Sequence, residues 1–193
     1  LGNGPQDPND PVTVPMPAGD SPETGEGDCH WAGYGHDTML AGANPTANQI
    51  LTAYNAWSAQ SQGVAPGHEQ DDGTNMADAL VWALTHDMEG NVVTLGQGLV
   101  NLFAPVHPAT LGATLQKYQR GVLMGVNCTS CDQANFPQGW TVSPSCQPDP
   151  QDGHVVYLVV LRADGSGVVV SWGQKVPADA AWMGVCPEEW WIL

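Results

Sequence analysis

The chain has very few positively charged residues. Lys and Arg together number 4 among 193 residues, against 20 Asp and Glu, so the formal net charge is −16 at pH 7. Binding to a nucleic-acid backbone or to an anionic lipid surface depends on clustered cations that pair with the phosphates. The composition therefore argues against a nucleic-acid partner and against a membrane-surface partner.

Long apolar runs are also missing. The longest ones are about strand length, and none approaches the ~18 apolar residues that indicate a membrane-spanning helix. The chain begins with neither Met nor a basic, Leu-rich leader, which we interpret as a processed or partial chain. Its length suits one domain with a substantial core.

The first 27 residues are rich in Pro, Gly, Asp and Asn and show neither a helical nor a strand period. This composition predicts an extended arm over residues 1–27, followed by one folded domain over residues 28–193. The arm has too few large apolar side chains to fold alone, so we expect it to pack on its own domain or on a neighbouring protein subunit. The expected anchoring contacts are Val12, Val14, Pro15 and Met16.

Helical signals come first along the rest of the chain. Cys29 begins a stretch with core residues at helical spacing, and Asp28 before it is a candidate N-cap. Thr46 and Gln49 have the form of a capping box at the start of a second helix. A third helix is predicted to open at Asp72-Gly73-Thr74, and a shorter fourth to span residues 109–118.

Strand signals dominate the second half of the chain. Segments of strand length and apolar composition are predicted at residues 91–95, 99–103, 121–126, 154–161, 167–172, 181–185 and 190–193. Helices followed by antiparallel strands predict an α+β fold, in which an N-terminal helical half packs against a C-terminal antiparallel β half. A cleft between the two halves is the expected place for a site.

The five cysteines are an odd number: Cys29, Cys128, Cys131, Cys146 and Cys186. If the last four pair in an oxidising setting, Cys29 remains a free thiol, as a nucleophile requires. We predict a disulfide from Cys146 to Cys128 or Cys131. A partial zinc site is the alternative, but it lacks a second C-x-x-C or His pair and would take His154 as its fourth ligand.

Two motifs carry the chemistry. Cys29 opens a helix, where the helix dipole and the first N–H groups favour a thiolate. His154 stands at the mouth of a buried strand, 154 − 29 = 125 positions later, and a second strand then ends in Trp172-Gly173. A Cys followed at roughly this distance by a His is the order of papain-type nucleophile and base.

With these residues the chain resembles papain-like cysteine peptidases. It is most similar to uncharacterised papain-like proteins of actinobacterial and phage genomes, in the segments Gly27-Asp28-Cys29, Gly35-His36, Gly153-His154-Val155 and Trp172-Gly173-Gln174 and in a Trp-rich end. The resemblance covers Gly27 to the C-terminus. It implies a papain-like fold and a thiol peptidase or amidase that acts on a peptide or other amide, with Cys29 as nucleophile, His154 as base, and neither a cofactor nor a metal.

The chain departs from the papain pattern at two positions. Glu23 stands where papain-like enzymes have a Gln that donates to the oxyanion, and a carboxylate cannot donate in this way. Val170 stands where they have the Asn that orients the His. Ser171, Gln174 or Asp164 are the remaining candidates to orient His154, and the Trp172 ring is expected to shield the site from water.

A non-catalytic interpretation stands beside the hydrolase. In it the papain-like fold serves a structural or binding protein, such as a virion-surface or secreted accessory protein, and Cys29 and His154 are ordinary core residues. The predicted disulfide and the acidic surface favour an extracellular or virion-surface location under either interpretation. His30 is predicted to be exposed, and His36 to be a buried structural residue.

Overall fold

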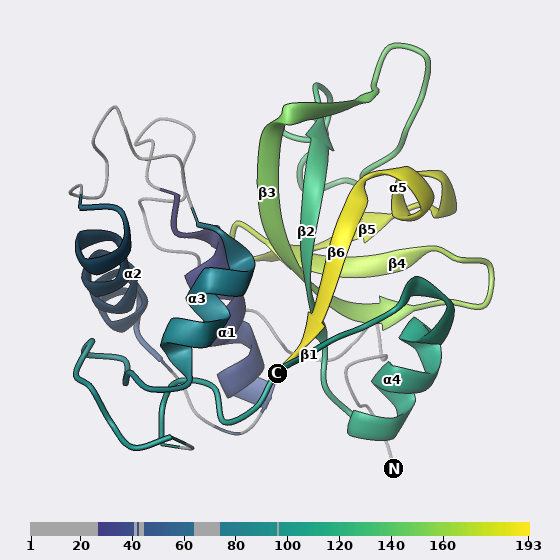
Figure 1. The fold of residues 1–193 in the computed structure, drawn as a ribbon. Helices are drawn as coiled ribbons and strands as arrows, with labels where there is room; N and C mark the ends of the chain where they lie inside the picture. The colour runs from purple at the N-terminus through teal and green to yellow at the C-terminus, as the bar shows by residue number, and fades with distance from the viewer. Residues whose placement is uncertain (1–26, 41, 43–44, 64–73, 96) are drawn as a thin grey trace. The chain divides into compact units, whose positions relative to one another are not determined.

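A computed structural model describes residues 27–40, 42, 45–63, 74–95 and 97–193 (Figure 1). The described chain forms two compact units, the helical unit up to Phe103 together with Leu193, and the sheet unit from Ala104 to Ile192. The predicted arm and its anchors lie outside the described residues. Within the described part, no helix has the length and apolar character needed to cross a bilayer.

The helical unit contains α1 (Cys29–Leu40), α2 (Ala47–Ser61) and α3 (Met76–Ala83) (Figure 1). The α1 helix begins directly after Asp28, whose carbonyl accepts the N–H groups of Trp31 and Ala32. The predicted capping box is confirmed: Thr46 and Gln49 each accept a backbone N–H of the other. The α3 helix begins after Asn75, whose side chain accepts the N–H of Asp78. Asp72 and Gly73 of the predicted helix start lie outside the described residues.

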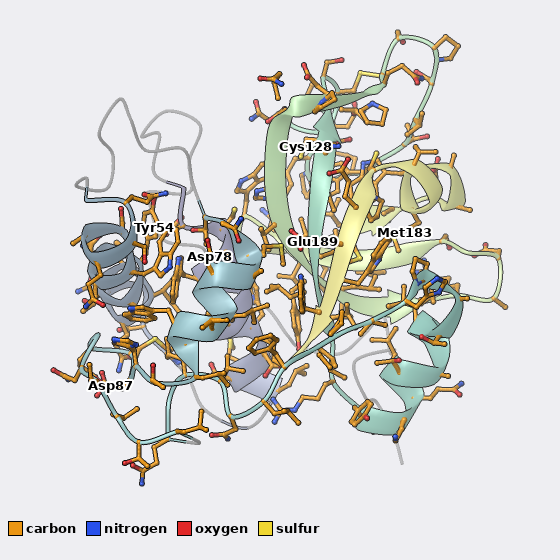
Figure 2. All side chains as sticks on the ribbon, viewed as in Figure 1. Tyr54, Asp78, Asp87, Cys128, Met183 and Glu189 are labelled. Atoms are coloured by element: carbon orange, nitrogen blue, oxygen red, sulfur yellow. A yellow bond between two sulfur atoms is a disulfide. The ribbon has the colours of Figure 1, made fainter. Side chains whose placement is uncertain are left out.

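An aromatic cluster forms the core of the helical unit. Trp31 lies edge-on to Tyr34 and Trp82, with ring centroids 5.3 and 5.4 Å away, and is tilted against Trp57 at 5.9 Å. Tyr54, labelled in Figure 2, stacks on Trp57 from the preceding turn of α2. These rings join all three helices, because they come from α1, α2 and α3.

The strands predicted at residues 91–95 and 99–103 are wrong. Among the residues of this region that the structure describes, which exclude residue 96, there is only an isolated bridge, between His86 and Val92. The backbone N–H groups of Val93, Leu99 and Val100 bond instead to carbonyls at the end of α3 and just after it. Three of the apolar side chains that suggested strands are exposed, at 77% for Val92, 68% for Leu95 and 74% for Leu102, whereas Val100 is buried. Apolar character without a pairing partner therefore produced a loop.

The sheet unit contains six strands and three short helical segments. In chain order these are β1 (Ala104–Pro105), η2 (Pro108–Thr110), α4 (Leu111–Tyr118), β2 (Val122–Thr129), β3 (Pro148–Leu161), β4 (Gly167–Ser171), β5 (Gln174–Ala178), α5 (Ala180–Val185) and β6 (Pro187–Ile192). All strand pairs are antiparallel, in the order β1-β6-β2-β3-β4-β5 (Figure 1). The α+β class with an antiparallel sheet is thus confirmed.

Four predicted strands and the fourth helix are confirmed, but the strand predicted at residues 181–185 is wrong. That segment is α5, because the Asp179 side chain accepts the N–H of Trp182 and caps a helix there. The sequence analysis missed β5, a short strand at the edge of the sheet that contains Pro177. Both errors concern segments too short for a periodic signal.

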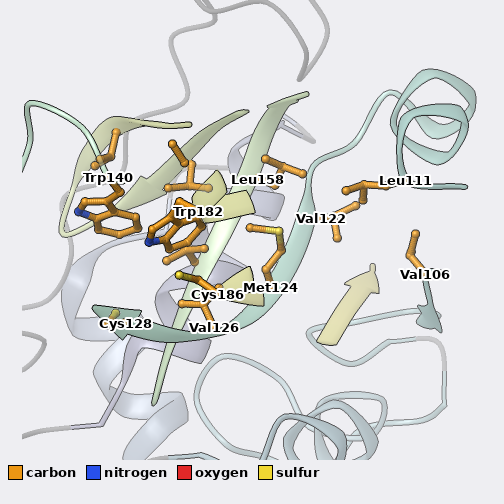
Figure 3. Packing of buried hydrophobic residues seen from close by; sticks show 14 of the residues in the cluster. Val106, Leu111, Val122, Met124, Val126, Cys128, Trp140, Leu158, Trp182 and Cys186 are labelled. Carbon is orange, nitrogen blue, oxygen red and sulfur yellow. The ribbon is translucent and has the colours of Figure 1, made fainter. Parts of the chain in front are cut away.

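The core of the sheet unit packs on one face of the strands (Figure 3). Val156 and Leu158 of β3 and Val169 of β4 belong to it, as do Leu111 and Leu115 from the start and middle of α4. Figure 3 shows Trp140 and Trp182 side by side at one end of this cluster, with ring centroids 5.1 Å apart. Because side chains alternate along a strand, His154 and Ser171 lie on the same face as these core residues.

Candidate active site

His154 lies on β3 opposite Val126 of β2 and is half-buried. Its Nε2 atom is 2.8 Å from the Oγ atom of Ser171, the last residue of β4. The Ser171 side chain is 0% exposed. Of the three residues considered to orient His154, the structure therefore brings Ser171 to it.

The other two candidates have different environments. Asp164 accepts the backbone N–H and the hydroxyl of Ser166 in the turn between β3 and β4, which lowers the pKa of its carboxyl group. Gln174 begins β5 and is exposed. Val170, at the position of the papain Asn, is buried next to Ser171 and faces the opposite side of β4.

Trp172 covers the His154 ring. The two rings stack with centroids 5.0 Å apart and an interplanar angle of 21°. Trp172 and Gly173 form the tight turn between β4 and β5, and both have positive φ, 44° and 72°. A left-handed backbone conformation is unfavourable for a residue with a large side chain. The packing of the Trp172 ring against its neighbours offsets this cost. The ring is thus held against the imidazole, and the predicted shielding of the site from water stays a prediction.

Two aromatic residues from the loop after β2 complete this packing. Phe136 and Trp140 lie edge-on to Trp172, with ring centroids 5.0 and 5.8 Å from it. Burial lowers the pKa of His154 from 6.5 to about 4, so the ring is neutral at pH 7. A neutral imidazole has one N–H donor and one nitrogen that can accept a proton.

The same loop is closed by a disulfide between Cys131 and Cys146, whose Cα atoms are 5.5 Å apart (Figure 2). This confirms one of the two predicted pairings. Cys128 and Cys186 are buried and form no disulfide, so the full pairing of the four C-terminal cysteines does not occur. Burial is the main cause that raises the pKa of Cys186 to about 12, and its thiol is therefore protonated at neutral pH.

The zinc alternative loses its ligands, because two of its three sulfur atoms are joined in the disulfide. In the part of the chain that the structure describes, no group of three or more His, Cys, Asp or Glu could hold a metal ion.

A buried carboxylate anchors the loop, and the sequence analysis missed it. Asp132 accepts hydrogen bonds from the N–H and hydroxyl of Thr129, at 2.8 Å each, and from Nε1 of Trp182 at 3.0 Å. Its backbone carbonyl accepts Nε1 of Trp140 at 3.0 Å. Asp132 therefore ties the loop to both core tryptophans, and Trp140 in turn contacts Trp172. The donors lie 8 residues away at Trp140 and 50 residues away at Trp182, so no capping or turn pattern of the sequence indicated them.

Cys29 is the first residue of α1, is partly exposed and is not part of a disulfide. This is the helix position that the sequence predicted for a nucleophile. Cys29 belongs to the helical unit and His154 to the sheet unit. Their pairing stays a prediction. Glu23, which the papain resemblance places at the oxyanion-binding Gln, lies outside the described residues.

The predicted exposure of His30 is wrong, since its side chain is 0% exposed. Its Nε2 atom is 2.6 Å from the hydroxyl of Tyr34, one helical turn later. The prediction failed because residues 30–37 of α1 are all buried, so this stretch has no solvent face for a helical period to reveal. His36 is buried as predicted, and burial lowers the pKa of both histidines to about 3.

Comparison with known proteins adds no relative, because neither a protein-family model nor a curated protein matches the sequence. Function is therefore inferred from the residues themselves.

Proposed function

We propose that the protein is a papain-like thiol hydrolase, a peptidase or amidase that cleaves an amide bond through Cys29 as nucleophile and His154 as general base. The observation that carries this proposal is the environment of His154. Its imidazole is neutral, is hydrogen-bonded at Nε2 to Ser171 and is stacked under Trp172, which leaves Nδ1 for proton transfer. A nucleophile, a base and a group that orients the base are the parts that such catalysis needs.

In the proposed reaction, Nδ1 of His154 takes the proton of the Cys29 thiol as the sulfur attacks the carbonyl carbon of the amide. The oxygen becomes an oxyanion, and the backbone N–H of Cys29 is the donor expected to stabilise it, because the N-terminus of a helix favours negative charge. The tetrahedral intermediate collapses, the C–N bond breaks, and His154 gives its proton to the leaving amine. Water, deprotonated by His154, then hydrolyses the thioester and restores the thiol.

Catalysis of this kind is expected to be slow. Glu23 takes the place of an amide donor, and the loss of one oxyanion donor typically costs about 100-fold to 1000-fold in rate. The carboxylate would also repel the developing negative charge. The substrate would therefore be an activated or tightly bound amide, or turnover would be low.

A second candidate function is a non-catalytic structural or binding protein on the same fold, at a virion surface or secreted. The observations that favour it are Glu23 and the formal charge of −16. The Cys131–Cys146 disulfide supports an extracellular location for both candidates, since such bonds persist in oxidising compartments. Neighbouring subunits bound through residues 1–27 are the partners that this candidate predicts.

Alkylation of the native protein with iodoacetamide separates the two functions. Cys128 and Cys186 are buried and Cys131 and Cys146 are paired, so labelling should be confined to Cys29. Mass spectrometry across pH then measures the rate at this one thiol. The hydrolase predicts rapid labelling well below the ordinary thiol pKa of about 8.5.

The variants His154→Gln and His107→Gln complete the experiment, because His107 is an exposed histidine of the same unit. Loss of rapid labelling in His154→Gln alone supports the dyad. Labelling that follows an ordinary thiol pKa in all three proteins would refute it. In a crystal structure the sulfur and a His154 nitrogen should be roughly 3 to 4 Å apart, and a separation above about 8 Å would exclude a shared site.

A further inference from the structure

We infer that Ser171 is the positioning residue for His154: its hydroxyl accepts the Nε2–H and thereby makes Nδ1 the basic nitrogen of the ring. The catalytic consequence rests on the proposed function, whereas the positioning of the ring does not. Ser171 would thus orient His154, the role that Val170 cannot fill because its side chain has no polar group.

The burial of Ser171 is the first argument. Its side chain is 0% exposed and ends β4, whose three preceding residues are all Val. A buried hydroxyl without a partner is destabilising, and Val or Ala would fill this position without that penalty. The hydrogen bond of 2.8 Å to Nε2 of His154 gives the hydroxyl its partner.

The rigidity of the pair is the second argument. His154 and Ser171 lie on neighbouring strands, 17 residues apart in sequence, and the turn at Trp172 follows Ser171 directly. The Trp172 ring stacks on the imidazole, and Phe136 and Trp140 hold the Trp172 ring. The imidazole therefore has one hydrogen bond in its plane and one ring on its face, which together define its orientation.

A change in the charge of the ring is the third argument. A serine hydroxyl can accept a hydrogen bond from Nε2–H while Nδ1 is unprotonated. When Nδ1 takes a proton, the ring becomes an imidazolium, and the same Nε2–H···Oγ bond becomes charge-assisted and stronger. Ser171 therefore favours both the tautomer that accepts a proton and the ion that results.

Ser171 itself is not the nucleophile in this arrangement, although it lies within hydrogen-bond reach of a histidine. A nucleophile must meet the substrate, and the Ser171 hydroxyl is fully buried, whereas Cys29 is partly exposed. Covalent labelling of Ser171 by a fluorophosphonate would overturn the inference.

NMR of ¹⁵N-histidine-labelled protein tests the inference. Long-range ¹H–¹⁵N spectra distinguish the two neutral tautomers, and the wild type is expected to carry its proton on Nε2. A wild-type proton on Nδ1 would overturn the inference, and this result needs no variant to fold. Ser171→Ala should give mixed tautomers, and Ser171→Thr, which keeps the hydroxyl, should restore the wild-type spectrum.

The rate of Cys29 alkylation gives the functional readout. Ser171→Ala should slow it about five- to tenfold, as expected for the loss of one hydrogen bond to the base. Ser58→Ala is the matched control, because Ser58 is also a fully buried serine but its hydroxyl bonds to Gln62 of the helical unit. An unchanged tautomer together with an unchanged rate in Ser171→Ala would overturn the inference. A third outcome is possible, in which Ser171→Ala shifts the tautomer but neither Ser171→Ala nor His154→Gln changes the rate of Cys29 alkylation. This outcome would support Ser171 as the positioning residue and would refute the Cys29–His154 dyad.

Discussion

Lowering the pH from 7.5 to 5.0 should reduce the free energy of unfolding of the helical unit by about 2 kcal/mol through His30. Replacing His30 and Tyr34 together by Phe should abolish this loss. His30 is fully buried, and burial lowers its pKa from 6.5 to about 3. The unfolded chain therefore binds a proton at this residue between these two pKa values, and the folded chain does not. Stability is present above the unfolded pKa and falls as the pH falls through this window.

The magnitude follows from the two pKa values. Between pH 7.5 and 5.0 the unfolded His30 goes from mostly neutral to almost fully protonated, while the folded His30 stays neutral. Proton linkage gives a loss of about 2 kcal/mol in the free energy of unfolding over this range. The loss continues at about 1.4 kcal/mol per pH unit until the pH reaches the folded pKa.

Both residues must be replaced because they are partners. Nε2 of His30 is 2.6 Å from the Tyr34 hydroxyl, and His30→Phe alone would leave that hydroxyl buried without this partner, at a cost of about 1 to 3 kcal/mol at every pH. The double variant removes both polar groups and keeps two rings of similar size. Its stability at pH 7.5 should therefore be close to that of the wild type.

Urea unfolding at pH 7.5 and 5.0 measures the effect, with hydrogen exchange of peptides from α1, α2 and α3 reporting on the helical unit alone. His36 is present in both proteins, so its contribution cancels in the comparison. His107→Phe, at an exposed site in the sheet unit, is the control: it removes a hydrogen bond to Ala109 there but should leave the pH dependence of exchange in α1, α2 and α3 as in the wild type. An equal loss of stability in the wild type and the double variant would refute the reasoning, because it would mean that His30 does not resist protonation in the folded state.

Replacing both cysteines of the Cys131–Cys146 disulfide by Ser should lower the free energy of unfolding of the sheet unit by about 3 kcal/mol, since a loop with a sequence separation of 15 is then open in the unfolded chain. Equal urea midpoints for the oxidised wild type and the variant would contradict this. Thr46→Ala removes the capping box and should cost about 1 kcal/mol, seen as faster hydrogen exchange in the first turn of α2; unchanged exchange there would argue against it. Asp132→Ala leaves the Trp182 indole N–H without its acceptor and should cost about 3 kcal/mol or more in thermal or urea unfolding. A change below about 1 kcal/mol would show that the loop is held by other contacts.

Local signals predicted those elements that local interactions form. The capping box at Thr46 and Gln49 is a contact between residues three apart, and it was readable from the sequence. The strands around 121–126 and 154–161 were readable because long Val- and Leu-rich runs favour a buried sheet. The segment 181–185 was misread because one side chain, Asp179, determines its helix.

The features of the candidate site also fall into two groups, those that local sequence indicates and those that tertiary contacts decide. The sequence by itself determined that Cys29 begins a helix and that His154 stands on a strand before a Trp-Gly turn. It also favoured a disulfide from Cys146 to one of two nearby cysteines over a zinc site. Each of these depends on residue type and short spacing. Only the tertiary structure decided that Ser171 bonds to His154, that Asp132 anchors the loop, and that His30 is buried. These three results depend on the pairing of distant strands and on helix packing, which set the surroundings of a side chain and through them its pKa.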